Sequence, residues 1–303
     1  MNGVINEYAT PIRLYDFEMV CGAAEDNQYP DEYEIPRENT GTLKSQGTVS
    51  ACVACVISQI AEVLHKVDFG ETEEMSEGYA YGALRNPDSK SEGMLVTTAL
   101  NYWHKLGIVP KKYLDILTEM PEMKKVVEKF PELAEIAAQH KIGGYSVINY
   151  ADKNKKDLAI KKALTENERP LLAVSNDYFR ESHCIELVGW NDKNNKYKIK
   201  NSWGTTYGDK GFGEIPKDEI NQVYVILPQE LELPFTDVDK NAWYYKYIKQ
   251  VYFNGLMKGT SETTFEPERF MTRAEVATLV ANILEMVDDR FDNFNKVLNE
   301  KLD

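Results

Sequence analysis

Apolar residues recur at helical spacing through the first half of the chain. Between residues 50 and 67 they occupy one stripe of a helix, at positions 53, 56, 57, 60, 61 and 64. A second helix is predicted over residues 94–106 and should end at Gly107, because glycine adopts the left-handed conformation that terminates helices. Residues 121–140 carry a similar pattern that is interrupted near Pro131, which indicates a helical hairpin.

The pattern changes in the second half of the chain. Short β-branched or alternating runs are separated there by Asn, Asp, Gly and Lys, which is typical of strands and turns. These runs lie at residues 171–174, 184–190, 196–201 and 223–227. Helices followed by antiparallel strands predict a domain of the α+β class.

Five segments follow from these patterns. Residues 1–30 are expected to form an N-terminal arm that could serve as a short pro-region, within an extended, unpacked lead-in that reaches residue 40. The main domain is predicted at 31–228, followed by an acidic, proline-bounded linker at 229–234 and a small, mainly helical domain at 235–285. The tail, 286–303, could be an amphipathic helix or a frayed terminus.

The composition of the 303 residues argues against several classes of partner. A formal net charge of −14 argues against nucleic acid, because phosphate binding needs clustered Lys and Arg. No apolar run approaches the roughly 18 residues that span a bilayer, so no membrane span is expected. The first ten residues lack the features of a secretory signal, so a cytoplasmic protein is expected unless a leader has been removed.

Four cysteines are too few and too scattered to predict a disulfide framework. Cys52 and Cys55 have the spacing of a redox or metal-binding pair, but they lie in an apolar, helix-like run with no second pair. We therefore expect no metal and no cofactor, with a redox pair as the alternative.

Cys52 is the candidate nucleophile. A thiol attacks a carbonyl as the thiolate, and both a helix N-terminus and a neighbouring imidazolium lower the pKa of a thiol. Cys52 falls in the first turn of the first predicted helix. Gln46 lies just before it, where its amide could join the Cys52 N–H in binding an oxyanion. The alternative is a cysteine that only packs in the helix.

Two residues downstream favour the catalytic interpretation. His183 and Asn201 follow Cys52 at about 130–150 residues, a separation found between catalytic cysteine, histidine and asparagine. His183 begins one predicted strand and Asn201 ends the next, so a hairpin would bring them together. Asn201 could then orient the imidazole.

Four segments carry a family pattern. They are QGTVSAC at residues 46–52, Ser-His-Cys with Val-Gly-Trp at 182–190, Lys-Asn-Ser-Trp-Gly at 200–204, and Glu-Gly-Met at 92–94 before the second helix. Together these segments resemble the papain family of cysteine peptidases. The resemblance implies a helical lobe and an antiparallel β lobe with a cleft between them. It also implies that Cys52 is the nucleophile, His183 the acid and base, Asn201 its orienter and Gln46 the oxyanion donor.

The same resemblance implies a substrate site. Gly93 would pair with the backbone of a peptide or protein substrate, and Trp203 would shield the His–Asn pair. Ala173 and Cys184 would line the subsite for the second residue before the scissile bond. The chain departs from the family where Val49, Val53 and Tyr207 replace a disulfide cysteine and two tryptophans, and in a shorter stretch from 174 to 183, which should reshape one cleft wall.

A second pattern covers residues 235–284. Its parts are FTDV at 235–238, Trp243, GLMKG at 255–259, FEP at 265–267 and MTRAEVA at 271–277. They resemble the S-layer homology (SLH) domain of bacterial surface proteins, although Thr272 and Glu275 also have a structural explanation as a helix capping box. The resemblance implies binding to acidic secondary cell-wall polysaccharide, with Trp243 and Arg273 as candidate contacts.

The number of copies leaves the role of this domain open. Family members typically carry three such repeats and this chain has one, so it could bind the wall weakly, require oligomerisation or dock on the peptidase. The resemblance implies an extracellular or cell-surface location in a bacterium.

Three functions are consistent with these observations. The main hypothesis is a thiol-dependent endopeptidase that hydrolyses peptide bonds through a Cys–His–Asn triad and an acyl-enzyme at a bacterial surface. One alternative is an acyl-transferring or amide-cleaving enzyme that uses the same residues on wall peptides. Another is a non-enzymatic surface binding protein, against which the intact constellation of catalytic residues weighs.

Overall fold

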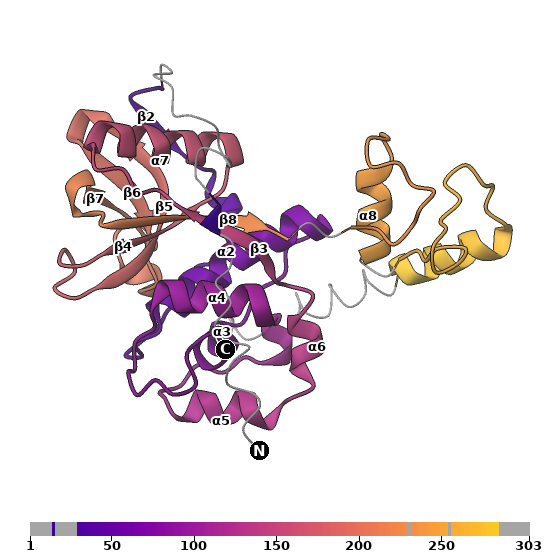
Figure 1. Ribbon diagram of the computed structural model, residues 1–303, viewed down its shortest axis with the longest axis horizontal. Coiled ribbons are helices and arrows are strands. Elements are labelled where there is room, and N and C mark those ends of the chain that lie inside the picture. Colours follow the sequence, from indigo (N-terminus) through magenta and orange to yellow (C-terminus); the bar gives the residue numbers. More distant parts are fainter. Residues whose placement is uncertain (1–13, 16–28, 230–231, 254–255, 285–303) are drawn as a thin grey trace. The chain divides into compact units, whose positions relative to one another are not determined.

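The computed structural model describes residues 14–15, 29–229, 232–253 and 256–284 (Figure 1). These residues fall into two compact units, the first within Met1–Val67 and Glu71–Glu230 and the second within Asp68–Gly70 and Leu231–Asp303. The division falls inside the predicted linker. Among the described residues, no helix is both long enough and apolar enough to cross a membrane.

The helical part of the first unit is built around α2, Cys52–Phe69, which is the first predicted helix. Its predicted apolar stripe is buried, since every one of those six side chains is at most 5% exposed. Burying such a side chain contributes about 1.5–3 kcal/mol. The other helices of this part are α3 Glu77–Ala83, α4 Val96–Leu106, α5 Glu122–Lys129 and α6 Leu133–Ala137.

Two further helix predictions are confirmed. The second predicted helix is α4, and it ends at Gly107 with a φ of 87°. A Cβ atom at Gly107 would lie 1.7 Å from the carbonyl oxygen of Ala137, so the position requires glycine on both counts. The predicted hairpin consists of α5 and α6, separated around Pro131. The pattern gave no indication of α3.

The strands of the first unit form one sheet. They are β1 Leu14–Tyr15, β2 Glu32–Glu34, β3 Ile142–Val147, β4 Leu171–Ser175, β5 His183–Asn191, β6 Lys196–Lys200, β7 Phe212–Pro216 and β8 Gln222–Pro228. Their order is β1-β3-β8-β4-β5-β6-β7, with β2 on β5. All pairs are antiparallel except β1 with β3. The four predicted strands are present, as β4, β5, β6 and β8.

The two faces of the sheet pack against different helices. Helix α7, Lys153–Asn167, buries Ile160 and Leu164 in a cluster with Ala173 and Ile185. The α2 side of the molecule forms another cluster, which includes Val174 and Cys184 together with the α2 stripe. Because neighbouring residues of a strand point to opposite faces, these clusters lie on either side of the sheet. The start of α2 therefore lies against β4 and β5.

Single 3-10 turns connect several of these elements. They are η2 Arg37–Asn39, η3 Lys111–Tyr113, η4 Asp192–Asn194, η5 Gly204–Thr206 and η6 Lys217–Glu219.

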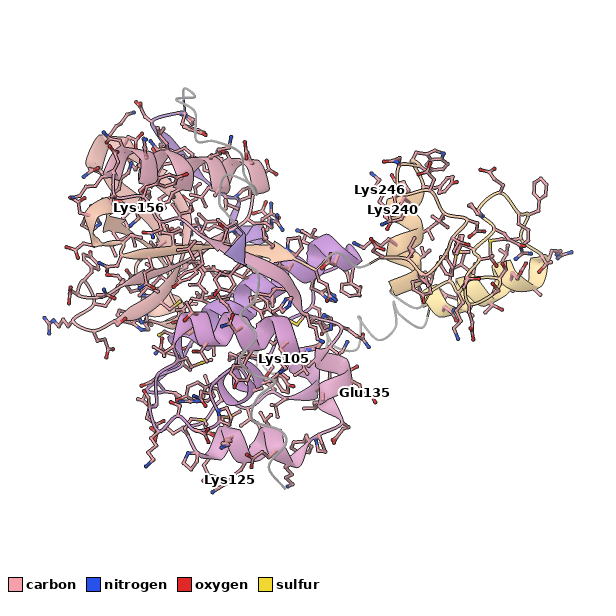
Figure 2. The ribbon with its side chains drawn as sticks, viewed as in Figure 1. Lys105, Lys125, Glu135, Lys156, Lys240 and Lys246 are labelled. Atoms are coloured by element: carbon pink, nitrogen blue, oxygen red, sulfur yellow. The ribbon has the colours of Figure 1, made fainter. Side chains whose placement is uncertain are left out.

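Charged side chains such as Lys105, Lys125 and Glu135 lie exposed on α4, α5 and α6 (Figure 2). Exposed pairs such as Lys125 with Glu122, at 2.8 Å, add little stability, so apolar burial holds these helices in place.

The expectation of an unpacked lead-in up to residue 40 is wrong for its last part. Strand β2 pairs with β5, and Ile35 is fully buried. The indole N–H of Trp190 donates to the carbonyl of Pro30 at 3.0 Å. The rest of the predicted arm, apart from residues 14–15 and 29–30, lies outside the described residues.

The second unit contains α8, Tyr245–Phe253, and a helix over residues 273–284. Phe235, Val238 and Ile248 form its core, each 6% exposed. The predicted capping box is present, since the Thr272 hydroxyl accepts the Glu275 N–H at 3.2 Å and the Glu275 carboxylate accepts the Thr272 N–H at 2.7 Å. The predicted tail, 286–303, lies outside the described residues.

Candidate active site

Cys52 is the first residue of α2 and lines a cavity of about 830 Å³. The chain before it is folded tightly, because the Val49 N–H donates to the Gln46 carbonyl and the Ala51 N–H donates to the Val49 carbonyl, at 3.0 and 2.8 Å. The first N–H groups of a helix have no intrahelical acceptor, so the Cys52 N–H can donate a hydrogen bond to an oxyanion.

His183 and Asn201 come together because β5 pairs with β6. Nε2 of His183 lies 2.8 Å from Oδ1 of Asn201. The same Asn201 atom accepts the backbone N–H of Ser202 at 2.7 Å, which identifies it as the amide oxygen. Nε2 therefore carries the proton and donates a hydrogen bond to the Asn201 oxygen. The other ring nitrogen, Nδ1, is left as the proton acceptor.

Gln46 is held in place by hydrogen bonds at both ends. Its backbone N–H donates to the Ser202 carbonyl at 2.9 Å, and its side-chain oxygen accepts the Ser202 hydroxyl at 2.6 Å. Its Nε2 donates to the Val49 carbonyl at 2.9 Å. Because an amide nitrogen carries two hydrogens, a second donor remains, and Gln46 lines the same cavity as Cys52.

Aromatic rings cover the His–Asn pair. The ring centroids of Trp203 and His183 are 5.0 Å apart, and Phe179 meets His183 edge-on at 4.9 Å. Phe179 also contacts Trp203, at 5.3 Å. His183 is only 3% exposed and Asn201 is fully buried, so water has little access to their hydrogen bond.

Most of the predicted site residues meet in this one cavity. Those that line it are Gln46, Cys52, Gly93, His183, Cys184 and Trp203. Ala173 does not line it, because its side chain packs in the cluster beneath α7, and the neighbouring Val174 lines the cavity instead. Residues alternate between the faces of a strand, so Ala173 and Val174 lie on opposite faces of β4 and only Val174 lies on the cavity side.

Burial governs the ionisation of Cys52 and His183. Burial raises the pKa of the Cys52 thiol, and the nearby charge of Glu181 raises it further. Hydrogen bonds with the backbone N–H groups of Cys184 and Val53 act in the opposite direction and lower this pKa. Burial lowers the pKa of His183, while the hydrogen bond with Asn201 and the charge of Glu181 act to raise it. Both net shifts stabilise the neutral form of each group, and the shift at Cys52 opposes the effect of the helix N-terminus on the thiol.

The other cysteines of the described residues are less suited to react. Cys52, Cys55 and Cys184 are all free thiols. Burial raises the pKa of both Cys55 and Cys184, and only Cys52 is partly exposed. Cys52 and Cys55 lie one turn apart on α2 as free thiols, and Cys55 is fully buried.

Sequence reasoning missed several residues that shape the site. Val174 could have been found from strand alternation once β4 was predicted. Ser202 belongs to the Asn-Ser-Trp-Gly run, which gave no indication that its hydroxyl holds Gln46. Phe179 and Glu181 lie in the short stretch before His183, where no pattern points to a ring contact or a charge near the thiol.

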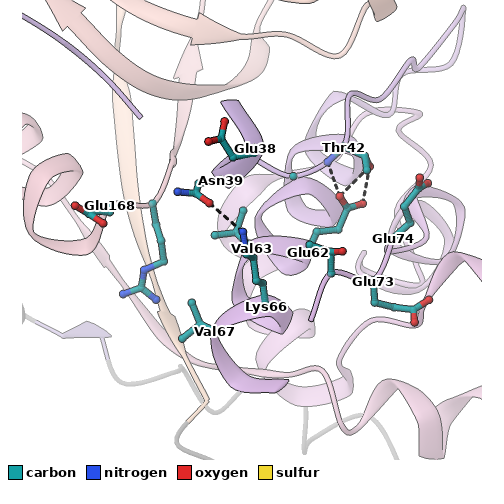
Figure 3. Close-up of a pocket in the computed structure, with 13 residues that line it drawn as sticks. Glu38, Asn39, Thr42, Glu62, Val63, Lys66, Val67, Glu73, Glu74 and Glu168 are labelled. Atoms are coloured by element: carbon teal, nitrogen blue, oxygen red, sulfur yellow. Dashed lines mark hydrogen bonds between the residues drawn. The ribbon is translucent and has the colours of Figure 1, made fainter. Parts of the chain in front are cut away.

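A second cavity in the first unit, of about 640 Å³, is lined by none of the predicted site residues (Figure 3). Several carboxylates border it, including Glu73 and Glu74. Glu62 is engaged within the protein, because it accepts the Thr42 hydroxyl at 2.8 and 2.9 Å and pairs with Lys44 at 2.7 Å. The catalytic candidates therefore lie in the larger cavity.

The candidate wall contacts lie in the second unit. Trp243 is 78% exposed, and its ring contacts those of Tyr244 and Tyr247. Lys240 and Lys246 join Trp243 in lining a cavity of about 430 Å³. Arg273 is exposed at the first residue of the helix over 273–284.

Residues 29–227 match the family model described as "Papain family cysteine protease". The chain belongs to the papain family of cysteine proteases. Among solved structures, xylellain, a cysteine protease from Xylella fastidiosa, aligns with a TM-score of 0.57 and 18% identity, over 73% of this chain and 94% of that one. That likeness shows the fold, so the predicted papain-like α+β architecture is confirmed.

Residues 234–277 of this papain-family chain match the model of the S-layer homology domain, as predicted. The Surface-layer 125 kDa protein of Lysinibacillus sphaericus is 37% identical over 60 residues, which is 20% of this chain. An endoglucanase of Bacillus sp. (strain KSM-635) is 43% identical over 47 residues, or 16% of this chain. The chain spans 5% of the length of each of these relatives.

Proposed function

We propose that this papain-family protein is a thiol-dependent endopeptidase with Cys52, His183, Asn201 and Gln46 as its catalytic residues. The observation that carries the proposal is the 2.8 Å hydrogen bond from His183 to Asn201, beside a cavity that Cys52 and Gln46 also line. This bond leaves Nδ1 of His183 as the base for a neutral thiol.

Acylation begins with proton transfer. Nδ1 of His183 accepts the thiol proton as Sγ of Cys52 attacks the carbonyl carbon of the peptide. The carbonyl oxygen becomes an oxyanion, which the Gln46 amide and the Cys52 N–H stabilise. The imidazolium then gives its proton to the leaving amine, the C–N bond breaks, and a thioester remains on Cys52.

Deacylation uses the same groups in the opposite direction. His183 removes a proton from water, whose oxygen attacks the thioester carbonyl. The second oxyanion collapses and expels the Cys52 thiolate, which recovers its proton from His183. The acyl half of the substrate leaves as a carboxylic acid, so the cycle hydrolyses one peptide bond.

Substrate contacts are proposed for the remaining lining residues. Gly93 pairs with the peptide backbone, and Trp203 excludes water from the His–Asn pair. Cys184, with Val174 in place of Ala173, lines the subsite for the second residue before the scissile bond. Their modest, mainly apolar side chains suit an apolar residue there.

The SLH match favours a wall location and a second candidate activity. The domain at 235–285 would attach the peptidase domain at 31–228 to secondary cell-wall polysaccharide at a bacterial surface. Exposed Trp243 with Lys246, and Arg273 at a helix start, suit an acidic sugar. An enzyme held there could cleave or transfer wall peptides with the same four catalytic residues.

Thiol labelling tests the catalytic assignment. An epoxide inhibitor should modify Cys52 alone, and the His183→Ala variant should lose the reaction. Cys184→Ser serves as the matched thiol control and should still be labelled at Cys52. Absence of labelling in the unmodified protein would favour the non-enzymatic binding protein. Cleavage of a peptide library, compared with purified wall peptides, separates the two enzymatic candidates.

Retention on cell-wall sacculi tests the attachment. The full chain carrying Cys52→Ala should sediment with sacculi and not with sacculi stripped of polysaccharide. Trp243→Ala or Arg273→Gln should weaken retention, whereas Arg37→Gln, in the first unit, should not. Equal retention on stripped sacculi would exclude the polysaccharide as the ligand.

A further inference from the structure

Arg85 is a buried cation in the wall of the cavity that contains Cys52. It follows α3 and is 5% exposed. Its Nη2 donates to the carbonyl oxygens of Ser91 and, at 3.3 Å, of Gly93. Arg85 thus lies against the segment proposed to pair with the substrate backbone.

Arg85 lacks a counter-charge among the residues that the structure describes. No carboxylate of these residues lies within 4.0 Å of its guanidinium, and its Nε and Nη1 are buried without an acceptor. The other buried cations of this part of the chain are all paired: Lys44 with Glu62, Lys161 with Asp157, and Lys200 with Glu186. An unpaired buried charge is costly, and neither the two carbonyls nor the Tyr81 ring, 5.3 Å from the guanidinium carbon, supplies a negative charge that would neutralise it.

The cavity wall around Arg85 suits an anion. Asn86, Ser89, Ser91 and Thr98 line it there and offer amide and hydroxyl donors. Of the carboxylates in the described part of the chain, only Glu181 lines this cavity, and it is exposed and adjoins the other wall, before His183. Salt screens a buried charge only weakly, so the positive charge of Arg85 attracts an anionic group that lies in the cavity.

We infer that the Arg85 side of the cleft binds a carboxylate of the substrate, supplied by an acidic residue on the acyl side of the scissile bond. The inference rests on the proposed peptidase function and names its substrate class. The carboxylate receives hydrogen bonds from the hydroxyls of the 89–98 segment, and its charge compensates the guanidinium. Arg85 is thus a specificity-determining residue and takes no part in bond cleavage.

Paired peptides test the inference on the full-length protein. Fluorogenic substrates differ only by Glu or Gln at each of the three positions before the scissile bond. The unmodified enzyme should cleave one Glu peptide about tenfold more efficiently in kcat/KM than its Gln partner. Arg85→Met should abolish the difference and retain cleavage of the Gln peptide. Lys90→Gln removes an exposed charge from the same loop and should keep the preference.

Arg85→Met could disturb the loop it holds, so the unmodified enzyme decides the question by itself. Equal cleavage of Glu and Gln peptides at all three positions, or a preference for Lys, overturns the inference. If epoxide labelling of Cys52 and peptide cleavage persist in that case, the proposed function stands without it. If both labelling and cleavage are absent, the proposed function fails, and the inference falls with it.

Discussion

The hydroxyl of Ser202 donates to the side-chain oxygen of Gln46 at 2.6 Å. Ser202 follows Asn201 directly, and its N–H donates to the Asn201 oxygen that also receives His183. Ser202 therefore connects Asn201, the proposed orienter of His183, with Gln46, the proposed oxyanion donor. While Ser202 holds the Gln46 oxygen, the amide nitrogen donates to the Val49 carbonyl at 2.9 Å.

Loss of this hydroxyl should reduce the rate of the chemical step. In Ser202→Ala the Gln46 amide loses one of its fixed partners, so we expect kcat to fall about tenfold with little change in KM. Gln46→Ala should cost more, about 10²–10³ in kcat, as removal of an oxyanion donor does. Steady-state kinetics on a fluorogenic peptide measures both.

Ser182 provides the matched control for that measurement. It precedes His183 directly, lines the same cavity and is exposed. Ser182→Ala should keep kcat within about twofold, because its hydroxyl pairs with Asn176, at 3.5 Å, rather than with Gln46 or Asn201. Equal losses in Ser182→Ala and Ser202→Ala would contradict a specific role for the Ser202 hydroxyl.

The environment of His183 predicts the acidic limb of the pH profile. Burial holds its pKa below the ordinary value of 6.5, so the base should stay unprotonated to lower pH and the limb of kcat/KM should lie below 6.5. The Asn201 hydrogen bond opposes this shift. Asn201→Ala should therefore move the limb to still lower pH and lower kcat about 10²-fold through loss of ring orientation. Movement of the limb to higher pH would disprove the assignment.

Glu181 gives a second pH prediction. Its negative charge raises the pKa of both Cys52 and His183, because an anion stabilises the protonated form of each group. Glu181→Gln should therefore shift both limbs of the kcat/KM profile to lower pH. Glu135→Gln, on an exposed position of α6, is the control and should leave the profile unchanged (Figure 2). A shift of equal size in both variants would mean that only net charge matters.

The parts of the structure that could be predicted have local signals. The α2 stripe extends over 18 residues with one buried face, which long apolar periodicity reveals. The meeting of His183 and Asn201 was predictable because His183 begins one recognisable strand of a hairpin and Asn201 follows the other. The papain-like and SLH patterns likewise lie in short, contiguous runs.

The missed parts depend on contacts distant in sequence. Strand β2 has three residues between two prolines and exists because β5 offers it a partner. Helix α3 contains Gly78 and Gly82, which weaken helix propensity and obscure its pattern. The unpaired state of Arg85 follows from where loop 86–93 lies, and nothing in the local sequence reveals it.

Lys200 should be important for stability. It is 1% exposed and lies 3.6 Å from fully buried Glu186, whose pKa burial raises to about 7. Its ammonium also donates to the carbonyls of residues 40–42. Lys200→Met leaves Glu186 without a partner and should lower the free energy of unfolding by about 3–5 kcal/mol in denaturant titration.

Lys198 in the same strand is the control for this prediction. It forms surface pairs with Glu32 and Glu34 at 2.6 and 3.0 Å, so Lys198→Met should cost at most about 1 kcal/mol. The double variant Glu186→Gln with Lys200→Met should recover part of the loss, because no buried charge remains. If both lysine variants lose the same stability, the buried pair has no special importance.

Gly259 should decide whether the SLH domain folds. A Cβ atom there would lie 2.4 Å from a ring carbon of Phe235 and 2.5 Å from the carbonyl oxygens of Ser261 and Thr264. Phe235 belongs to the small core of the second unit, so Gly259→Ala should destabilise that unit by about 1–3 kcal/mol. We expect faster proteolysis within residues 232–284 and reduced retention on sacculi.

None of the atoms that a Cβ at Gly259 would approach belongs to the first unit, so epoxide labelling of Cys52 should persist in Gly259→Ala. The exposed neighbour Lys258, changed to Ala, should leave the proteolysis rate unaltered, and loss of labelling in Gly259→Ala would contradict independent folding of the two units.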